Sequence, residues 1–294
     1  MVISFTAAAD LKLHNPSADV FVPDGLAEAS ALARVTHLGI GAHQDDLEFM
    51  AFDGIAACYD SQGEWFAGVA CTNGAGSART AAYADFTDAQ MTFARRDEQR
   101  KAAELGRYAA MVQLDHPSCA AKDAADRRLV DDIGSILAAS TPRVVYTHNL
   151  ADKHDTHVAV ALKVIQAIRE LPADERPAAV HGCEVWRDLD WMLDCEKVIH
   201  DVSGYEGLAA TLGGVFESQI AGSKRYDLAV MGRRQANATF FESDKIDRSE
   251  AISFAMDLTP LVADDRLDIA AYVAGYIERF RSDVTDRIAR HLGK

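Results

Sequence analysis

The sequence predicts a three-layer α/β/α fold, in which helices cover both faces of a mostly parallel, Rossmann-like sheet. Two observations predict it. Short apolar runs alternate along the chain with longer stretches of helical periodicity, and two clusters of histidine and aspartate each follow directly on an apolar run. Alternating strands and helices are typical of parallel sheets, and such sheets keep their chemistry where the strands end.

The apolar runs predict strands at residues 35–40, 65–71, 108–114, 143–147 and 178–185, with a late strand at 198–202. Between them, apolar side chains at helical spacing predict helices at residues 47–59, 89–105, 124–139 and 156–171. A capping box of Thr87 and Gln90 begins the second helix, and Ser203 with Glu206 predicts one more helix start.

The two ends of the chain differ from this alternating middle. Residues 1–34 are expected to form an extension, broken by prolines and a glycine before a helix at 27–33. Residues 263–292 predict a long amphipathic helix, whose stripe indicates core packing or, as the alternative, a subunit interface in a homo-oligomer. We expect one α/β domain over residues 1–294, because 294 residues that are 49% hydrophobic can bury one large core.

Composition argues against several partners and compartments. A formal net charge of -15 disfavours nucleic acid and anionic membranes, because an acidic surface repels both. The five cysteines are odd in number and lack Cys-x-x-Cys spacing, which is typical of free thiols in a reducing compartment. No apolar run approaches the ~20 residues of a membrane span, and no signal peptide is evident. A cytoplasmic protein is therefore expected.

The first polar cluster directly follows the strand at 35–40. His43 and Asp46 are three residues apart where the strand turns into a helix, so both can reach one divalent ion. Asp45 then points elsewhere and is placed to take a proton from a water molecule. The alternative is that the two aspartates only cap the helix, which acidic residues do well.

The second cluster follows the strand at 143–147. His148, His154 and His157 lie close together in sequence, and a helix begins near His157. His154 and His157 are again three residues apart at a junction between a strand and a helix, which repeats the geometry of the first cluster. A single histidine is more often a core or surface residue, but two matching clusters favour a metal site.

These two segments carry a family resemblance. Residues 42–48 (Ala-His-Gln-Asp-Asp-Leu-Glu), followed by residues 154–157 (His-Asp-Thr-His), resemble the PIG-L/LmbE family of zinc-dependent de-N-acetylases. The family motifs read Ala-His-Pro-Asp-Asp-x-Glu and His-Pro-Asp-His. Residues 72–76, 95–99 and 217–219 are also similar, so the resemblance spans about residues 35–235. The combination of two motifs is more specific than either alone.

The resemblance implies a role for each matching residue. His43, Asp46 and His157 would hold Zn²⁺, although Fe²⁺, Co²⁺ and Mn²⁺ also suit such donors. Asp45 would be the general base, and His154 would stabilise the oxyanion or protonate the leaving amine. The implied fold is LmbE-like.

Two residues depart from the family motifs. Gln44 replaces a proline, which removes no ligand. Thr156 replaces the aspartate that orients the catalytic histidine, so an acidic partner for His154 would have to come from Asp155 or Asp152.

Three further residues are candidate substrate contacts by resemblance and position. Arg95 matches an arginine of the family, with a surface ion pair to Glu98 as the alternative. Asp115 follows the third strand and is a candidate acceptor for a sugar hydroxyl, unless it only begins a turn. Glu48 is expected in the pocket by resemblance, and on the helix surface otherwise.

The resemblance implies a zinc-dependent hydrolase that acts on a linear amide and removes an acetyl group from a small N-acetylglucosamine-type sugar or conjugate. Three protein ligands leave one zinc position open for the attacking water. Two alternatives remain: a metal-dependent amidase acting on a different acylated amine, and a binding protein that keeps the fold without the chemistry.

Overall fold

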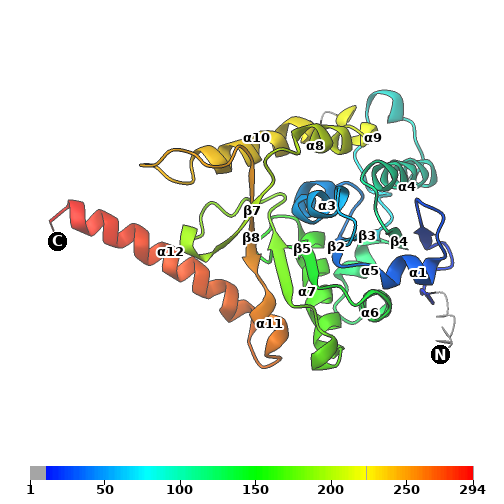
Figure 1. Ribbon diagram of the computed structural model, residues 1–294, viewed down its shortest axis with the longest axis horizontal. Coiled ribbons are helices and arrows are strands. Elements are labelled where there is room, and N and C mark those ends of the chain that lie inside the picture. Colours follow the sequence, from blue (N-terminus) through cyan, green and yellow to red (C-terminus); the bar gives the residue numbers. More distant parts are fainter. Residues whose placement is uncertain (1–10, 223, 294) are drawn as a thin grey trace.

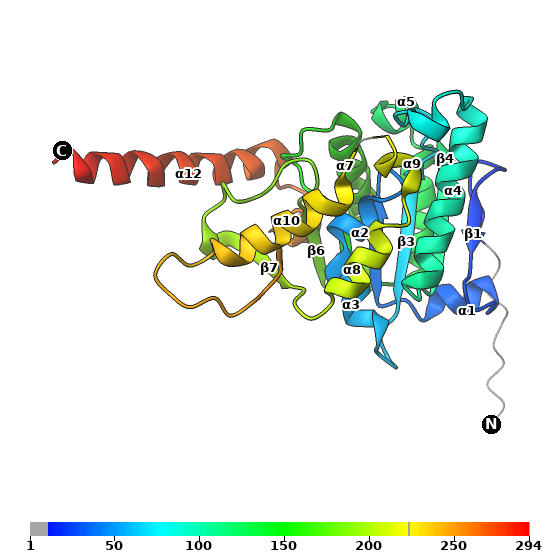
Figure 2. The same cartoon turned by 90° about the horizontal axis from the view of Figure 1, so that it is seen from above.

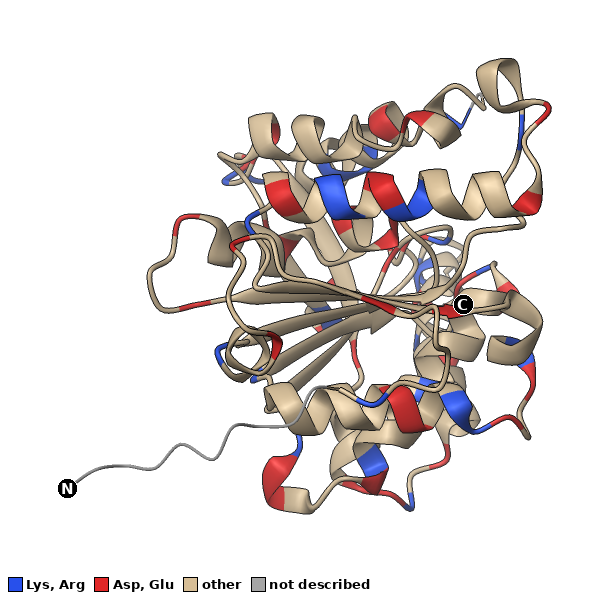
Figure 3. Cartoon of the chain, turned by 90° about the vertical axis from the view of Figure 1, so that its right-hand side faces the viewer, with Lys and Arg blue, Asp and Glu red and all other residues tan. Residues whose placement is uncertain are grey.

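The computed structural model describes residues 11–222 and 224–293. An eight-stranded sheet crosses them in the order β1-β4-β3-β2-β5-β6-β8-β7, and helices pack on both of its faces (Figure 1 and Figure 3). The strands are β1 (Asp19–Phe21), β2 (His37–Gly41), β3 (Phe66–Thr72), β4 (Ala110–His116), β5 (Val144–His148), β6 (Ala179–Cys183), β7 (Lys197–Asp201) and β8 (Ile252–Asp257).

The predicted α/β fold with a mostly parallel sheet is confirmed. Strands β4, β3, β2, β5 and β6 are parallel to one another, and they are the five strands expected from the alternating part of the sequence. Antiparallel strands complete both edges. β1 pairs with β4, whereas β8 pairs with both β6 and β7. The sequence predicted neither β1 nor β8.

The helices form two layers. One face of the sheet packs against α1, α6, α7 and α11, and the other against α2, α3, α4 and α8. The helices are α1 (Glu28–Ala33), α2 (Asp46–Met50), α3 (Phe52–Tyr59), α4 (Asp88–Leu105), α5 (Ser118–Lys122), α6 (Arg128–Ser140), α7 (Asp155–Glu170), α8 (Glu206–Gly213), α9 (Glu217–Ile220), α10 (Tyr226–Thr239), α11 (Thr259–Ala263) and α12 (Ile269–His291).

Several predicted helix boundaries differ from the structure. The expected helix at 47–59 divides into α2 and α3 at Ala51, whose ψ of 20° leaves the helical range. The capping box of Thr87 and Gln90 at the start of α4 is confirmed. The start predicted from Ser203 is wrong, because the Ser203 hydroxyl donates to Asp201 and α8 begins only at Glu206.

The helix expected at 263–292 begins only at Ile269, as α12, because α11 ends at Ala263 and residues 264–268 are not helical. The first turns of α12 pack against the core through Tyr272, Val273 and the buried Tyr276. The rest of α12 projects from the body of the protein (Figure 2). Ile277 is 51% exposed and Phe280 38% exposed, so core packing is the wrong interpretation for the outer part of the stripe. Among the described residues, no helix is apolar over a length that would cross a bilayer.

Candidate metal centre and active site

The two polar clusters meet at the carboxyl ends of β2 and β5, which are parallel neighbours. From β2 the strand order runs to β3 on one side and to β5 on the other, so β2 and β5 enclose the point where the order reverses. Ligands of open α/β sheets bind at such a point. A glycine lets α2 approach β2 closely, since an ideal Cβ on Gly41 would lie only 3.0 Å from the Cβ of Asp46.

Three side chains form a compact triangle of donor atoms. His43 Nδ1 lies 3.2 Å from His157 Nε2, and His157 Nε2 lies 3.4 Å from Asp46 Oδ1. The third side, from His43 Nδ1 to Asp46 Oδ2, measures 3.3 Å. Ligands at about 2.0–2.1 Å from a tetrahedral zinc ion are about 3.3–3.4 Å apart. Each of the three spacings is close to this value, and the two that involve Asp46 are measured to different oxygens of its carboxylate.

The charge states of the triangle also suit a cation. Burial lowers the pKa of His157 to about 4, which keeps its imidazole neutral and its lone pair available. Burial alone would raise the pKa of Asp46, but His157 and His148 lower it well below its ordinary value. Neutral histidine and ionised aspartate are the forms that bind metals.

Two sets of three side chains each offer donor atoms that all lie within 4.8 Å of one another. One combines Asp46 and His157 with His148, and the other combines His43 and His157 with His154. His148 is disfavoured as a ligand because its Nε2 already accepts a hydrogen bond from the Ala42 N–H at 2.9 Å. Its ring instead stacks on His157, with centroids 3.8 Å apart. Sequence reasoning assigned no role to His148, although its position at the end of β5 could have indicated one.

Asp45 lies next to the triangle without joining it. Its φ of 87° is a left-handed conformation that is strained for a residue other than glycine, and its side chain is thereby turned away from that of Asp46. Arg95 Nη2 donates to Asp45 Oδ2 at 2.9 Å. Burial raises the pKa of Asp45 to about 6, even though Arg95 acts in the opposite direction. A carboxylate with such a pKa can accept a proton near neutral pH.

His154 lies on another side of the triangle, with its ring centroid 4.9 Å from that of His43. Its Nδ1 accepts a hydrogen bond from the Thr156 N–H, so the neutral ring carries its proton on Nε2. The Asp152 carboxylate accepts instead from the His154 backbone N–H and lies 3.7 Å from His157 Nδ1. Within the described residues, neither Asp152 nor Asp155 bonds to the His154 ring, and the Thr156 backbone orients it.

Of the three predicted substrate contacts, only Arg95 borders the site. Its guanidinium is buried and donates to Asp45 and to the Gln44 carbonyl. The ion pair with Glu98 considered as the alternative also forms, at 3.4 Å, but it is largely buried and does not lie on the surface. Glu48 points into the core, where it accepts hydrogen bonds from Tyr108 and Gln99. Burial raises the pKa of Glu48 to about 7.

Asp115 is paired with Arg96 at 3.2 Å and accepts a hydrogen bond from Ser17. Neither Asp115 nor Glu48 lines the two pockets at the site.

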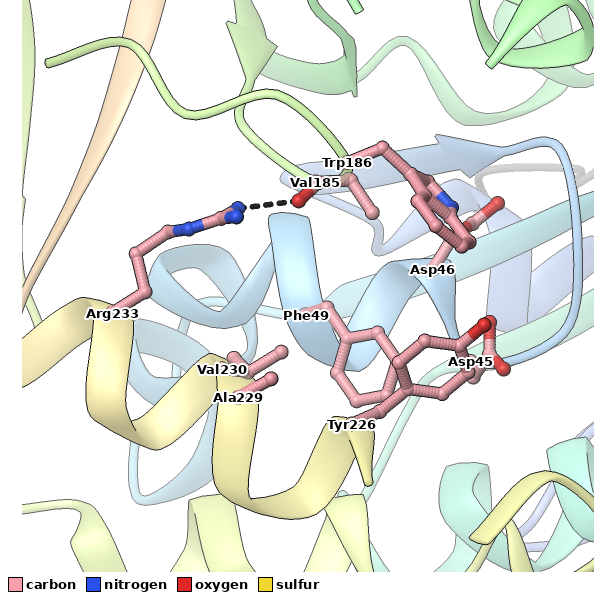
Figure 4. A pocket seen from close by; sticks show the side chains of 9 residues that line it. All are labelled: Asp45, Asp46, Phe49, Val185, Trp186, Tyr226, Ala229, Val230 and Arg233. Carbon is pink, nitrogen blue, oxygen red and sulfur yellow. Dashed lines mark hydrogen bonds between the residues drawn. The ribbon is translucent and has the colours of Figure 1, made fainter. Parts of the chain in front are cut away.

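Two pockets open at the candidate centre. A polar pocket of about 340 Å³ includes His43, Arg95 and His154 in its wall, together with glycines of the loop after β3. An apolar pocket of about 180 Å³ lies beside it (Figure 4). The two share three residues, Asp45, Asp46 and Trp186. Sequence reasoning missed Phe49 and Tyr226, which belong to no motif.

Comparison with known proteins supports the resemblance. The family model described as PIG-L, GlcNAc-PI de-N-acetylase, matches residues 38–168. The search of curated proteins finds no match. Among solved structures, N,N'-diacetylchitobiose deacetylase from Pyrococcus horikoshii aligns with a TM-score of 0.56 and 17% identity, over 74% of this chain and 83% of that chain.

Two further structures share the fold. The A40926 pseudoaglycone deacetylase Dbv21 has a TM-score of 0.56 and 14% identity, over 76% of this chain and 97% of its own. GalB, the 4-carboxy-2-hydroxymuconate hydratase from Pseudomonas putida KT2440, has a TM-score of 0.60 and 16% identity, over 76% of this chain and 96% of its own. Residues 38–168 therefore match the model of the PIG-L family, and the solved structures share the fold of this chain.

Proposed function

We propose that this chain is a metal-dependent hydrolase that removes the acetyl group from an N-acetylglucosamine-type sugar or conjugate. His43, Asp46 and His157 would hold the metal, with zinc as the expected ion. The observation that carries the proposal is the triangle of donors 3.2–3.4 Å apart, with Asp45 and His154 beside it. The family match to a de-N-acetylase supports the reaction type.

The residues around the triangle suit amide hydrolysis. A divalent ion bound there would lower the pKa of a water molecule to about 7 and polarise the amide carbonyl. Asp45 accepts the proton of the attacking water, and Arg95 keeps its carboxylate in place. His154 in its protonated form would donate from Nε2 to the oxyanion, a contact worth ~3 kcal/mol in comparable sites, and would return to the neutral imidazole when it gives that proton to the leaving amine.

The fold alone does not choose the reaction, because structural neighbours include both deacetylases and a hydratase. An amidase for another acylated amine would use the same residues and differ only in its pocket. A binding protein without chemistry would have no need of the strained Asp45 beside three metal donors.

The test compares two histidine variants. His157→Ala should lose both bound metal, measured by elemental analysis, and acetate release from N-acetylated sugars. His291→Ala is the matched control, because His291 is exposed at the end of α12 and far from the triangle. Unchanged turnover in His157→Ala would refute the proposal. Removal of metal with a chelator and reconstitution with Zn²⁺, Fe²⁺, Co²⁺ or Mn²⁺ would identify the active ion.

A further inference from the structure

The wall of the apolar pocket comes mainly from α10, α2 and the segment after β6. One face of α10 supplies Tyr226, Ala229, Val230 and Arg233, which follow one another at helical spacing. Phe49 from α2 packs against the Tyr226 ring, with centroids 5.6 Å apart.

The remaining wall comes from Val185 and Trp186, which follow β6. At the far end Arg233 donates to the Val185 carbonyl (Figure 4). Asp45 and Asp46 lie at the opposite end, so the pocket leads directly to the candidate centre.

The positions of the catalytic groups determine which half of an amide faces each pocket. His154 lines the polar pocket and does not line the apolar one. Because His154 is the group that protonates the leaving amine in the proposed mechanism, the amine half must lie in the polar pocket. There the side chains of Ser118, Lys122 and Gln219 offer hydrogen bonds to a sugar. The acyl half then faces the apolar pocket.

We propose that this pocket, formed mainly by Phe49, Trp186, Tyr226 and Val230, binds the acyl group of the substrate and favours a chain of about six carbons over acetyl. This inference rests on the proposed function. An apolar cavity of ~150 Å³ can hold benzene, which has six carbons. The pocket of about 180 Å³ therefore leaves most of its space unused around one acetyl methyl.

The reaction itself is ordinary amide hydrolysis. The oxygen of water bonds to the acyl carbon, the C–N bond breaks, and the water protons end on the amine and the medium. A hexanoyl amide yields hexanoate and a free amine, as an acetyl amide yields acetate. No oxidant, reductant or other reactant is needed. Only the size of the acyl group differs between the two substrates, so a rate difference reports on the pocket.

The test measures kcat/KM of the metal-loaded protein for N-acetyl-, N-butyryl- and N-hexanoylglucosamine by release of the primary amine. Burial of a methylene is worth ~0.8 kcal/mol, or about a fourfold gain per methylene. We expect kcat/KM to rise at least tenfold from acetyl to hexanoyl. A highest value for acetyl, with a steady fall as the chain lengthens, would overturn the inference.

Two substitutions on α10 localise the effect. Val230→Phe fills the pocket and should lower the hexanoyl-to-acetyl ratio of kcat/KM at least tenfold. Leu228→Phe is the matched control, since Leu228 is on the same helix, 60% exposed and outside this pocket. The control should keep the wild-type ratio. Equal ratios in the two variants would contradict the assignment of the pocket.

A binding measurement separates the pocket from the chemistry. Calorimetric titration of metal-free protein with hexanamide and acetamide, both uncharged, should give at least tenfold tighter binding of hexanamide, and Val230→Phe should remove the difference. Equal binding of the two amides would overturn the inference. Hydrolysis of none of the glucosamine amides would contradict the proposed function, and the calorimetric comparison would then decide on the acyl pocket alone.

Discussion

The substitution Arg95→Leu tests how the candidate base is held. The Arg95 side chain is 2% exposed and donates to Asp45 Oδ2 at 2.9 Å. Removing one partner of a buried ion pair typically costs ~3–5 kcal/mol, because the other charge stays buried without compensation. We expect a loss of this size in the free energy of unfolding, measured by urea titration with a chelator present. At pH 8 Asp45 is ionised in the wild-type protein, in which burial raises its pKa to about 6.

The neighbouring arginine on α4 is the control. Arg96 pairs with Asp115 at 3.2 Å but is 26% exposed, so Arg96→Leu should cost at most ~1 kcal/mol. In a double-mutant cycle, Asp45→Asn should recover about 1.5–3 kcal/mol of the Arg95→Leu loss. Glu98 does not obscure this result, because Ser218 also donates to it. Equal losses for the two arginine variants, or a coupling energy near zero, would refute the reasoning.

Three other predictions concern different parts of the molecule. His154→Ala should lower kcat by ~10²–10³-fold while elemental analysis still finds bound metal, because His154 lies outside the triangle. Gly54→Ala should destabilise the protein by ~1–3 kcal/mol, because the new Cβ would lie 2.6 Å from Tyr146 Cε2. Gly134→Ala is the control and should not destabilise the protein, because its Cβ would meet nothing within 4 Å. Thermal unfolding of the two variants checks the difference.

The third of these concerns pH. Burial would raise the pKa of Asp132, but hydrogen bonds from two histidines lower it below 3.8. The difference in unfolding free energy between wild type and Asp132→Asn should therefore be full at neutral pH and shrink as the pH falls below 3.8. Urea titration over this pH range measures the difference.

The sequence predicted the parallel part of the sheet well, because buried parallel strands are continuous apolar runs that can be recognised locally. The two strands it missed depend on distant partners. β1 has only three residues and is held by its pairing with β4. β8 lies between β6 and β7 although it follows both in sequence, so no alternation of strands and helices indicates it. Tertiary pairing decides such segments more than their own β propensity.

At the site, the spacing of residues in the sequence was sufficient to predict the proposed metal ligands, but it could not predict the residues that line the apolar pocket. His43 and Asp46 are three residues apart, so their convergence can be inferred without knowing the rest of the fold. Glu48 shares the same motif but points into the core toward Tyr108, which sequence alone cannot indicate. The apolar pocket combines segments that follow β2 and β6 with α10, and their meeting depends on the complete fold.

The balance of buried charge explains why a cation suits this place. Asp46 in the triangle and Asp45 and Asp152 beside it are all buried. Arg95 is the one buried guanidinium bonded to any of them in the described residues. The low pKa of His157 means that this imidazole supplies no compensating positive charge at neutral pH. Buried charges without partners are costly, and a divalent ion among the donors would compensate two of them. Asp45 would keep Arg95 as its partner when that ion is bound. The two adjacent aspartates can therefore serve separate roles, Asp46 as a metal ligand and Asp45 as the base.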